Sequence, residues 1–330
     1  MPSANVTARQ HLLPRLYMIK LKNQKMKPVS HIIIKNAMSV NELVGQMDSA
    51  GVLGAGRLGK AVNICEAMIK DRQCRVFLGL AGPLVPAGMR EIIIDIIKNR
   101  WVGVVVTTGA TLTHDLGEAL GYRHYQGSAD ADDAELRKKG FDRVYESYMP
   151  NRIYEGMEDF IAKNFEQLKD KKSIKDFLWE IGRLTPGKSI LKACFENKIP
   201  VFCPAISDSG IGLMIWGQLA KGKQSETRAF EDLKKIIDIA WTAKKAGVIY
   251  FGGGVPKNYI QQAMQFSKKA SYGVQITMDR PEPGGSSGAE LKEGISWGKL
   301  NPKAKFVDLI CDATIAMPVI YAALKERIKK

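Results

Sequence analysis

The stretch Val248-Ile249-Tyr250-Phe251-Gly252-Gly253-Gly254 joins a short apolar, β-branched run directly to three glycines. Such a run is typical of a strand buried on both faces of a sheet, and helical spacing follows it over residues 257–270. Three glycines at this junction allow a ligand backbone or phosphate to approach the next helix closely. A tight turn without a ligand explains them equally well, so the stretch indicates the fold and leaves the ligand open.

Five further apolar runs end in glycine, acidic or other short side chains, and each predicts a buried strand. They cover residues 74–80, 102–108, 200–205, 273–278 and 306–311. Segments with helical spacing separate them, at residues 87–99, 189–197, 229–245 and 314–328. This alternation predicts a Rossmann-like α/β fold, with a doubly wound, mostly parallel sheet and helices on both faces. Ligands of such sheets bind outside the carboxyl ends of the strands.

The chain of 330 residues is long enough for one large α/β domain. We expect residues 1–30 to form a helical N-terminal arm and residues 31–330 a single domain. Residues 130–184 are dense in charged and aromatic side chains, which predicts a helical insertion packed on the sheet.

Charge and composition exclude several classes of protein. The 49 Lys and Arg outnumber the 34 Asp and Glu, giving a net charge of +15, yet no nucleic-acid-binding motif accompanies the excess. No apolar run approaches the roughly 20 residues of a membrane span, and no secretory signal begins the chain, so we expect a cytoplasmic protein. The five cysteines lack metal-ligand spacing, so we expect reduced thiols and no metal.

The sequence Gly54-Ala55-Gly56-Arg57-Leu58-Gly59 matches the dinucleotide fingerprint GxGxxG. The fingerprint requires a buried strand immediately before it, whereas residues 46–51 have no strand character. We therefore interpret these glycines as the entry to a helix over residues 60–70.

Small, hydroxyl or acidic residues follow four of the predicted strands, where the sheet would present them to a ligand. A carboxylate there suits ribose hydroxyls, and glycines suit a phosphate. The four ends together favour a nucleotide, and their residues are Thr107-Thr108-Gly109-Ala110, Asp208, Gly252-Gly253-Gly254 and Asp312-Ala313-Thr314.

A flexible loop at residues 284–288 leads through a short helical stretch to Ser296-Trp297-Gly298-Lys299. An indole beside a lysine desolvates the ammonium, lowers its pKa and makes the neutral amine available as a nucleophile. From spacing alone, a surface lysine beside a packed tryptophan remains the default interpretation.

Several of these motifs resemble the deoxyhypusine synthase family, whose Ser-Trp-Gly-Lys motif carries a lysine that forms an imine with the transferred butylamine group. The resemblance extends from about residue 54 to 323. It includes Thr107-Thr108, the strand Val201-Phe202-Cys203-Pro204-Ala205, Gly252-Gly253-Gly254-Val255 with Lys257, and Asp312-Ala313 with Pro318.

The resemblance implies an NAD-dependent transfer. In the family, NAD takes hydride from spermidine, diaminopropane leaves, the butylimine passes to the lysine, and an acceptor amine displaces it before the hydride returns. It further implies a homotetramer with shared active sites. The implied catalytic residue is Lys299; the implied substrate residues are Trp297, Glu293, Asn258, Gln275 and Ser286; the implied NAD residues are Thr108, Gly109, His114, Asp208, Gly252, Gly253, Ser287, Asp312, Ala313 and Thr314.

Five positions depart from eukaryotic members of the family, which carry aspartate at Ser286 and Leu213, histidine at Asn258, tyrosine at Gln275 and glutamate at His114. Loss of two pocket carboxylates removes charge partners for a polyamine. We expect Asp279 and Glu282, just before the glycine and serine loop, to restore negative charge to the pocket.

Three functions remain open after this comparison. The acceptor is a lysine of a hypusine-type translation factor in deoxyhypusine synthase itself, and it is putrescine or another small amine in a homospermidine synthase. A protein that binds NAD as a catalytically silent oligomer is the third function, against which the retained Lys299 argues.

Overall fold

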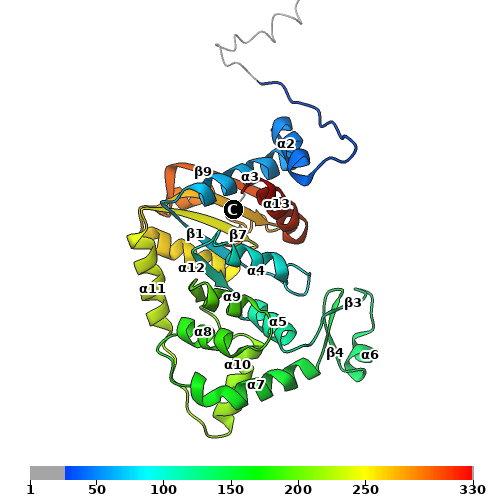
Figure 1. Ribbon diagram of the computed structural model, residues 1–330, viewed down its shortest axis with the longest axis vertical. Coiled ribbons are helices and arrows are strands. Elements are labelled where there is room, and N and C mark those ends of the chain that lie inside the picture. Colours follow the sequence, from blue (N-terminus) through cyan, green and yellow to red (C-terminus); the bar gives the residue numbers. More distant parts are fainter. Residues whose placement is uncertain (1–26, 329–330) are drawn as a thin grey trace, which may run out of the picture.

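The computed structural model describes residues 27–328, and its centre is a six-stranded sheet in which every neighbouring pair is parallel (Figure 1). This confirms the predicted α/β class. The strands lie in the order β6 (Val201–Phe202), β2 (Val104–Thr107), β1 (Cys74–Leu80), β7 (Lys245–Phe251), β8 (Ala270–Thr277) and β9 (Leu300–Ile310).

The strand order reverses between β1 and β7. The chain builds outward from β1 to β2 and β6, then returns to place β7 on the other side of β1, with Leu80 opposite Phe251. At this reversal the helices after β1 and β7 leave toward opposite faces, which opens a crevice at the carboxyl ends of these strands. The Ala81 N–H donates to the Phe251 carbonyl (2.9 Å), which holds the two turns together.

Alternating strand residues enter two separate cores, one on each face of the sheet. Leu78, Val105 and Ile249 belong to one core, whereas Phe77 and Val248 belong to the other. The first core is covered mainly by α3 (Leu53–Lys70), α4 (Arg90–Lys98), α5 (Gly109–Ala119), α9 (Ile190–Glu196) and α13 (Ala313–Arg327). The second is covered by α11 (Ala229–Thr242), α12 (Gly254–Gln265) and the 3₁₀ helix η1 (Leu291–Ile295).

The GxGxxG glycines lie inside α3, where they allow α2 (Val40–Ala50) to pack closely. A Cβ on Gly59 would lie 2.5 Å from the Asp48 Cα, and one on Gly56 would lie 2.3 Å from the Gly51 carbonyl carbon. These glycines therefore serve the packing of α2 on α3. They were expected to precede a helix over residues 60–70, but α3 begins seven residues earlier, at Leu53, and contains them.

Residues 130–184, predicted as a helical insertion, contain helices and also a β-hairpin that was not predicted. The helices are α6 (Asp133–Lys138), α7 (Arg152–Leu168) and α8 (Ile174–Leu184), but β4 (Phe141–Val144) and β5 (Ser147–Pro150) form a hairpin that pairs with β3 (Tyr125–Gln126). Tyr145 adopts a left-handed conformation (φ 58°) at the turn of this hairpin. The charges and aromatic rings that suggested helices instead cover a small antiparallel sheet, in which Tyr125 packs edge-on to Phe141.

Several other boundaries differ from expectation: α12 ends at Gln265 and not at residue 270, which already belongs to β8, and β9 begins at Leu300 and not at residue 306. Helix α11 ends at Thr242 because Ala243 is extended and Lys245 already belongs to β7, so the expected helix to residue 245 is wrong. Helix α12 begins at Gly254, one turn-length before the expected residue 257, which places the glycines in its N-terminal turn. The remaining helix of the second half is α10 (Gly210–Ala220).

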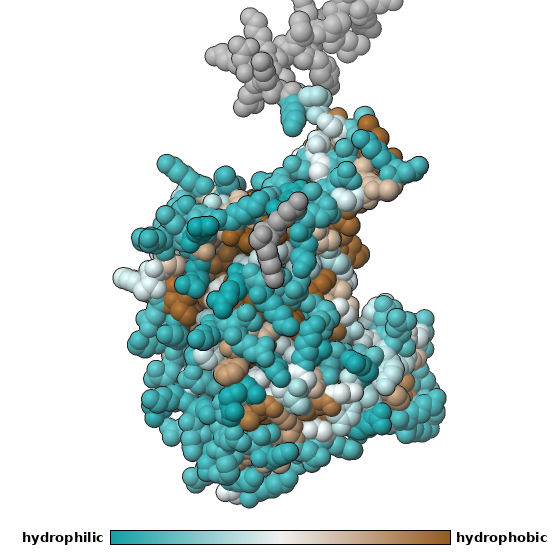
Figure 2. Space-filling view, in the orientation of Figure 1, coloured by the Kyte–Doolittle hydropathy of each residue, from teal (hydrophilic) through white to brown (hydrophobic). Residues whose placement is uncertain are grey.

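Most of the expected N-terminal arm lies outside the described residues, which begin at residue 27. Residues 27–39 form no helix or strand, so the part of the arm that the structure describes, residues 27–30, is not helical. Val29, Ile33 and Ile34 are exposed there. Figure 2 shows hydrophobic residues near the α2 end and in further patches across a face that is mostly hydrophilic.

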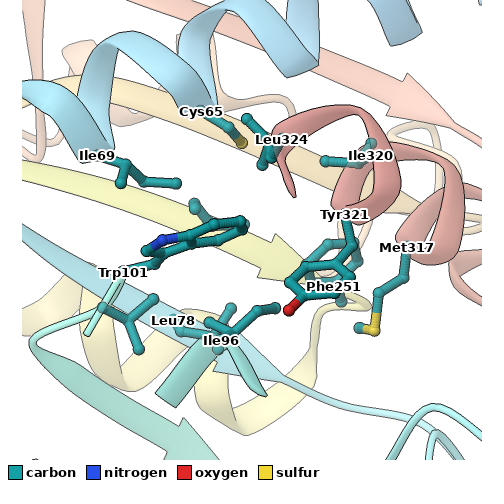
Figure 3. Close-up of a pocket in the computed structure, with 12 residues that line it drawn as sticks. Cys65, Ile69, Leu78, Ile96, Trp101, Phe251, Met317, Ile320, Tyr321 and Leu324 are labelled. Carbon is teal, nitrogen blue, oxygen red and sulfur yellow. The ribbon is translucent and has the colours of Figure 1, made fainter. Parts of the chain in front are cut away.

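A small cavity in the first core is not a ligand site. Its volume is about 20 Å³, and it lies between the sheet, α3, α4 and α13 (Figure 3). The ring centres of Trp101 and Tyr321, which both line it, are 5.3 Å apart. Its lining is apolar apart from the Trp101 indole nitrogen, the Cys65 thiol and the Tyr321 hydroxyl. The hydroxyl hydrogen-bonds to Asp95 on α4. A space near the size of one water molecule without convergent polar groups is a packing void. Across residues 27–328, no helix combines the length and apolar character needed to cross a bilayer.

Candidate active site

The turn after β7 lies at the crevice and is built for close approach. Gly252 adopts a left-handed conformation (φ 78°), and a Cβ there would lie 2.8 Å from the Ala81 carbonyl oxygen. Gly253 caps α12 and would place a Cβ 2.5 Å from the Ser287 Cα. Only glycine suits position 252. Any larger residue at position 253 would displace the loop of residues 284–288, called the serine loop below.

Ser287 joins that loop to the crevice. Its Oγ accepts a hydrogen bond from the Gly254 N–H (2.6 Å), one of the amide groups that a helix N-terminus leaves without an internal partner. Three predicted NAD residues, Gly252, Gly253 and Ser287, therefore lie in contact beside the β1–β7 reversal.

The turn after β2 brings two more predicted NAD positions together. Thr108 caps α5, and its Oγ1 accepts from the Thr111 N–H (3.2 Å). Gly109 packs on the next loop, because a Cβ there would lie 2.4 Å from the Ser209 Cβ and 3.4 Å from the Asp208 carbonyl oxygen. The Asp208 residue is exposed, so its carboxylate is available to a ligand.

Asp312 lies farther along the same edge, at the end of β9. Its carboxylate caps α13 by accepting from the Thr314 N–H (2.7 Å) and the Thr314 hydroxyl (2.8 Å). Ala313 and Thr314 form the first turn of that helix. Asp312 thus has a structural task, two strands away from the crevice.

The carboxyl ends of the parallel strands form one edge of the sheet, called the carboxyl edge below. At the crevice, the residues of this edge leave room for a dinucleotide. Gly82, directly after β1, has open space above its Cα, and Gly252 and Gly253 follow β7, so small residues line both sides of the reversal. Thr107, at the end of β2, has a buried hydroxyl with no hydrogen-bond partner among the described residues. Sequence reasoning missed Gly82, although its position after a predicted strand is a usable signal.

A pocket of about 420 Å³ opens beside this crevice, between α12 and the segment that contains the serine loop and η1. It brings together five of the six residues predicted for catalysis and substrate binding. Its lining residues are Lys257, Asn258, Gln261, Gln262, Gln265, Gly284, Ser286, Ala289, Glu290, Glu293, Gly294, Trp297 and Lys299.

Lys299 is positioned by the tight turn before it. Gly298 is left-handed (φ 70°), and the Lys299 N–H donates to the Gly294 carbonyl (2.7 Å). The Lys299 Nζ lies 5.0 Å from the centre of the Trp297 ring. Partial burial lowers the pKa of the Lys299 ammonium, which favours the neutral nucleophilic form.

Lys257 is a second lysine of the pocket and was not among the predicted site residues. It is 4% exposed, and its Nζ donates to the Ala289 carbonyl (2.6 Å). Burial lowers its pKa to about 8, against the opposing charges of Asp308, Glu293 and Asp279. Its place one turn after the three glycines could have drawn attention to it.

The family model for deoxyhypusine synthase matches residues 42–324. The chain belongs to the deoxyhypusine synthase family. It is 44% identical over 306 residues to Probable deoxyhypusine synthase 1 of Methanosarcina acetivorans, and the matched region covers 92% of this chain and 96% of that protein. It is 41% identical over 295 residues to Probable deoxyhypusine synthase 1 of Archaeoglobus fulgidus, across 89% and 96% of the two chains.

A crystal structure of a deoxyhypusine synthase homologue from Entamoeba histolytica shares the fold. It has a TM-score of 0.58 at 19% identity, over 87% of this chain and 93% of that one. Deoxyhypusine synthases are transferases, so the comparisons assign this chain to a transferase family.

Two of the pocket positions at which this chain departs from eukaryotic deoxyhypusine synthases lie outside the lining, namely Gln275 and Leu213. Gln275 is buried behind the pocket, where its Nε2 donates to the Ala289 carbonyl (3.1 Å). Leu213 lies on α10 and is 55% exposed. Neither side chain lines the pocket.

The carboxylates of the pocket are Glu290 and Glu293. Asp279 and Glu282, which we expected to supply negative charge, are exposed and lie outside the lining. Sequence reasoning missed Glu290 because its spacing from Glu293 is equally typical of a solvated helix face.

The last predicted NAD residue, His114, lies on α5 and also lies outside this pocket. Its Nδ1 is 2.9 Å from the Nε2 of His124. The structure therefore brings most predicted residues to one edge of the sheet, in two groups around the crevice and the pocket, and leaves His114 and Gln275 behind them.

Proposed function

We propose that this protein transfers a 4-aminobutyl group from spermidine or a related amine to an acceptor amine through an imine on Lys299. The observation that carries the proposal is Lys299 itself, half-buried against Trp297 in a pocket with two carboxylates and adjoining the crevice of a Rossmann-like sheet. Family membership supplies the class of reaction, and this geometry supplies the nucleophile.

The neutral Lys299 amine attacks the carbon of the substrate imine, whose C=N bond is replaced by a C=N bond to Nζ while diaminopropane leaves as the free amine. An acceptor amine then repeats the exchange and frees Lys299. Partial burial lowers the pKa of the Lys299 ammonium, which favours the neutral amine that the attack requires.

The remaining pocket groups bind and orient the amine. Glu290 and Glu293 have no ion-pair partner among residues 27–328, so both are available to a substrate ammonium. Lys257 holds the Ala289 carbonyl on the pocket wall through its Nζ hydrogen bond.

We propose NAD as the cofactor of the crevice, which when bound supplies reversible hydride acceptance. Gly82, Gly252 and Gly253 would hold its phosphates near the N-terminal turn of α12, and Asp208 its ribose hydroxyls. Thr108, Gly109 and Ser287 shape the same edge, and Asp312, Ala313 and Thr314 form its far end.

Two acceptors fit this pocket. A lysine of a hypusine-type translation factor makes the protein a deoxyhypusine synthase, the activity that its relatives' names favour. Putrescine makes it a homospermidine synthase, which is favoured by the neutral serine at position 286 of the lining, because an amine with fewer charges needs fewer carboxylates.

A second copy of the chain is part of the proposal. Leu213 and Trp216 on α10 are 55% and 66% exposed. Met278, directly after β8, and Ile315, in the first turn of α13, are each 62% exposed. Exposed apolar residues around a site indicate a protein interface. A partner covering this edge would complete a shared site in a homotetramer, as the family resemblance implies.

The test incubates the purified protein with NAD and spermidine labelled in its aminobutyl part. Putrescine and a hypusine-type factor are offered in separate reactions. Labelled factor supports the deoxyhypusine synthase, a labelled small product supports the homospermidine synthase, and absence of diaminopropane in every reaction overturns aminobutyl transfer.

A further inference from the structure

A hollow lies at the amino ends of the sheet strands, on the edge opposite the carboxyl edge. Its volume is about 590 Å³, which is within the range of small-molecule sites. The segments that lead into four adjacent strands, β1, β2, β6 and β7, form it. Because β1 has seven residues, the hollow is about 20 Å from the crevice at the other end of that strand. We call it the amino-edge hollow, and its lining residues are 69, 71–76, 100–103, 197–199 and 242–244.

The lining of this hollow is strongly basic. None of its five cationic residues has an ion-pair partner among residues 27–328. Like charges that share a hollow repel one another, and an anion between them removes that repulsion. The five residues, all exposed, are Arg72, Arg75, Arg100, Lys198 and Lys244.

The carboxylate of the lining is already neutralised by other groups. Asp71 accepts hydrogen bonds from the Lys245 Nζ (2.9 Å) and from the Gln73 N–H (3.0 Å), so it does not offset the five cations. The stem of Arg75 packs on the segment before β2, because a Cβ on Gly103 would lie 2.5 Å from the Arg75 Cδ. Five cations and one carboxylate give the lining residues a formal charge of +4.

Two of the cations occupy positions at which glycine is the usual residue. Arg100 and Lys198 directly follow the last residues of α4 and α9 and their C-cap asparagines, and both backbones are left-handed (φ 55° and 56°). This conformation is costly for a residue with a side chain. The Asn99 and Asn197 side chains cap the two helices by donating to carbonyls one turn earlier (2.8 and 2.9 Å). Helix capping therefore does not explain the two cations.

The chemistry of the lining favours phosphate groups. Three of the five cations are arginines, whose guanidinium binds phosphate oxygens through two parallel hydrogen bonds. The aromatic residue of the lining, Trp101, is 8% exposed and packs against Tyr321, so its ring does not offer a face for a base. One phosphate group carries a charge of about −2, so a lining of +4 fits several linked phosphates better than one.

We propose that the amino-edge hollow binds an anion with several linked phosphate groups, supplied either by an inorganic oligophosphate or by the phosphate chain of a nucleoside triphosphate. The three arginines hold phosphate oxygens, and Lys198 and Lys244 add positive charge. The hollow is separate from the crevice and from the Lys299 pocket, so this site does not depend on the proposed function. Binding stabilises the folded protein, because it removes repulsion among the cations.

The test measures binding of sodium tripolyphosphate to the full-length protein by isothermal titration calorimetry at low salt. Lys198→Gly removes one cation and gives the left-handed position its usual residue, so this variant should fold at least as well as the wild type. We expect its Kd to rise about three- to five-fold, and that of a double variant with Arg100→Gly about ten-fold or more. Lys198→Arg keeps the charge and should retain the wild-type Kd.

Lys269→Gly is the matched control. Lys269 is also exposed and left-handed (φ 66°), and it lies at the entry to β8, outside the lining. The control removes the same charge from the same kind of backbone position, so the Kd should change by less than about two-fold. Equal losses in Lys198→Gly and Lys269→Gly would show that the anion follows the net charge of the chain and would overturn the site. An unchanged Kd in the double variant would overturn it as well.

A comparison of ligands tests the chemical class. Because a nucleotide also fits the crevice, only binding that the double variant weakens is counted. Tripolyphosphate and ATP should then have similar Kd values, and adenosine should not bind. Binding of ATP without tripolyphosphate would indicate a nucleoside site, and binding of single-stranded RNA without tripolyphosphate would indicate a nucleic-acid site; either result overturns the proposal.

Thermal unfolding gives an independent measurement of the same site. Tripolyphosphate should raise the Tm of the wild type and of Lys269→Gly by similar amounts, and that of the double variant by less, because a ligand stabilises the folded state in proportion to its affinity. Equal Tm shifts in all three proteins would contradict binding in the amino-edge hollow.

Discussion

Lys257 and Lys299 show how one residue type takes two roles in the same pocket. Lys299 is the less buried and stands over the Trp297 ring without a hydrogen bond from Nζ to a described residue. Lys257 is almost fully buried, and its Nζ is tied to the Ala289 carbonyl. We therefore assign the nucleophile to Lys299 and a structural and electrostatic role to Lys257.

The lowered pKa of Lys257 predicts a dependence of stability on pH. Between about 8 and 10.5 the unfolded lysine binds more proton than the folded one, so this residue's contribution to the free energy of unfolding increases as pH rises through that range. The expected gain is on the order of 2–3 kcal/mol. Urea unfolding at pH 7.5 and 10 should show it in the wild type and not in Lys257→Met; equal pH dependence in both would contradict it.

Glu290 is the residue that we expect to set the pocket's affinity for cations. Glu290→Gln should raise the KM for spermidine about five-fold with a smaller change in kcat, because the carboxylate binds an ammonium in the ground state and in the transition state alike. Glu282→Gln is the matched control, an exposed carboxylate outside the lining. Equal KM changes in the two variants would remove Glu290 from the substrate site.

At the scale of elements, strands were predicted more accurately than the insertion. Residues 74–80 form β1 as expected, because a strand buried on both faces must be continuously apolar. The β4–β5 hairpin was missed because its residues are only half-buried and its turn depends on the left-handed Tyr145. Likewise, no local sequence pattern predicts the contact of His124 with His114 on α5, because only the fold brings the two side chains together.

The α2–α3 contact gives a prediction about the GxGxxG motif. Gly59→Ala should destabilise the protein by roughly 1–3 kcal/mol, because its Cβ would overlap the backbone of α2. Gly54→Ala, in the same helix with nothing within 4 Å of its Cβ, should be neutral or stabilising by up to about 1 kcal/mol. Thermal unfolding compares the two, and NAD affinity should be unchanged in Gly54→Ala. A large loss of NAD binding there would restore the dinucleotide interpretation of the motif.

At the scale of the whole molecule, the sequence predicts one set of residues at one sheet edge, and the structure places them in two groups. The crevice arises from the strand order, which no single segment encodes, and the pocket arises from contact between α12 and the serine loop. The chain has a net charge of +15, and the carboxylates in the pocket lining are Glu290 and Glu293. Attraction of a polyamine must therefore be local, against the field of the whole protein.

Assembly is tested by two equally exposed tryptophans. Trp216 on α10, beside the carboxyl edge, and Trp241 near the end of α11 are each 66% exposed. If a second copy covers the carboxyl edge, Trp216→Glu should reduce an assembly of four 36.5 kDa chains to smaller species, whereas Trp241→Glu should not. Light scattering during size-exclusion chromatography measures the mass, and an unchanged mass in Trp216→Glu would place the interface elsewhere.

The central claim is that Lys299 carries the aminobutyl group, and trapping the covalent intermediate tests it most directly. The protein is incubated with NAD and spermidine labelled in its aminobutyl part, reduced with borohydride, digested and analysed by mass spectrometry. We predict label on Lys299 in the wild type and none in Lys299→Arg, whose guanidinium forms no imine, with transfer reduced roughly 10³-fold or more and NAD affinity retained. Label on another residue, or full transfer by Lys299→Arg, would contradict the account.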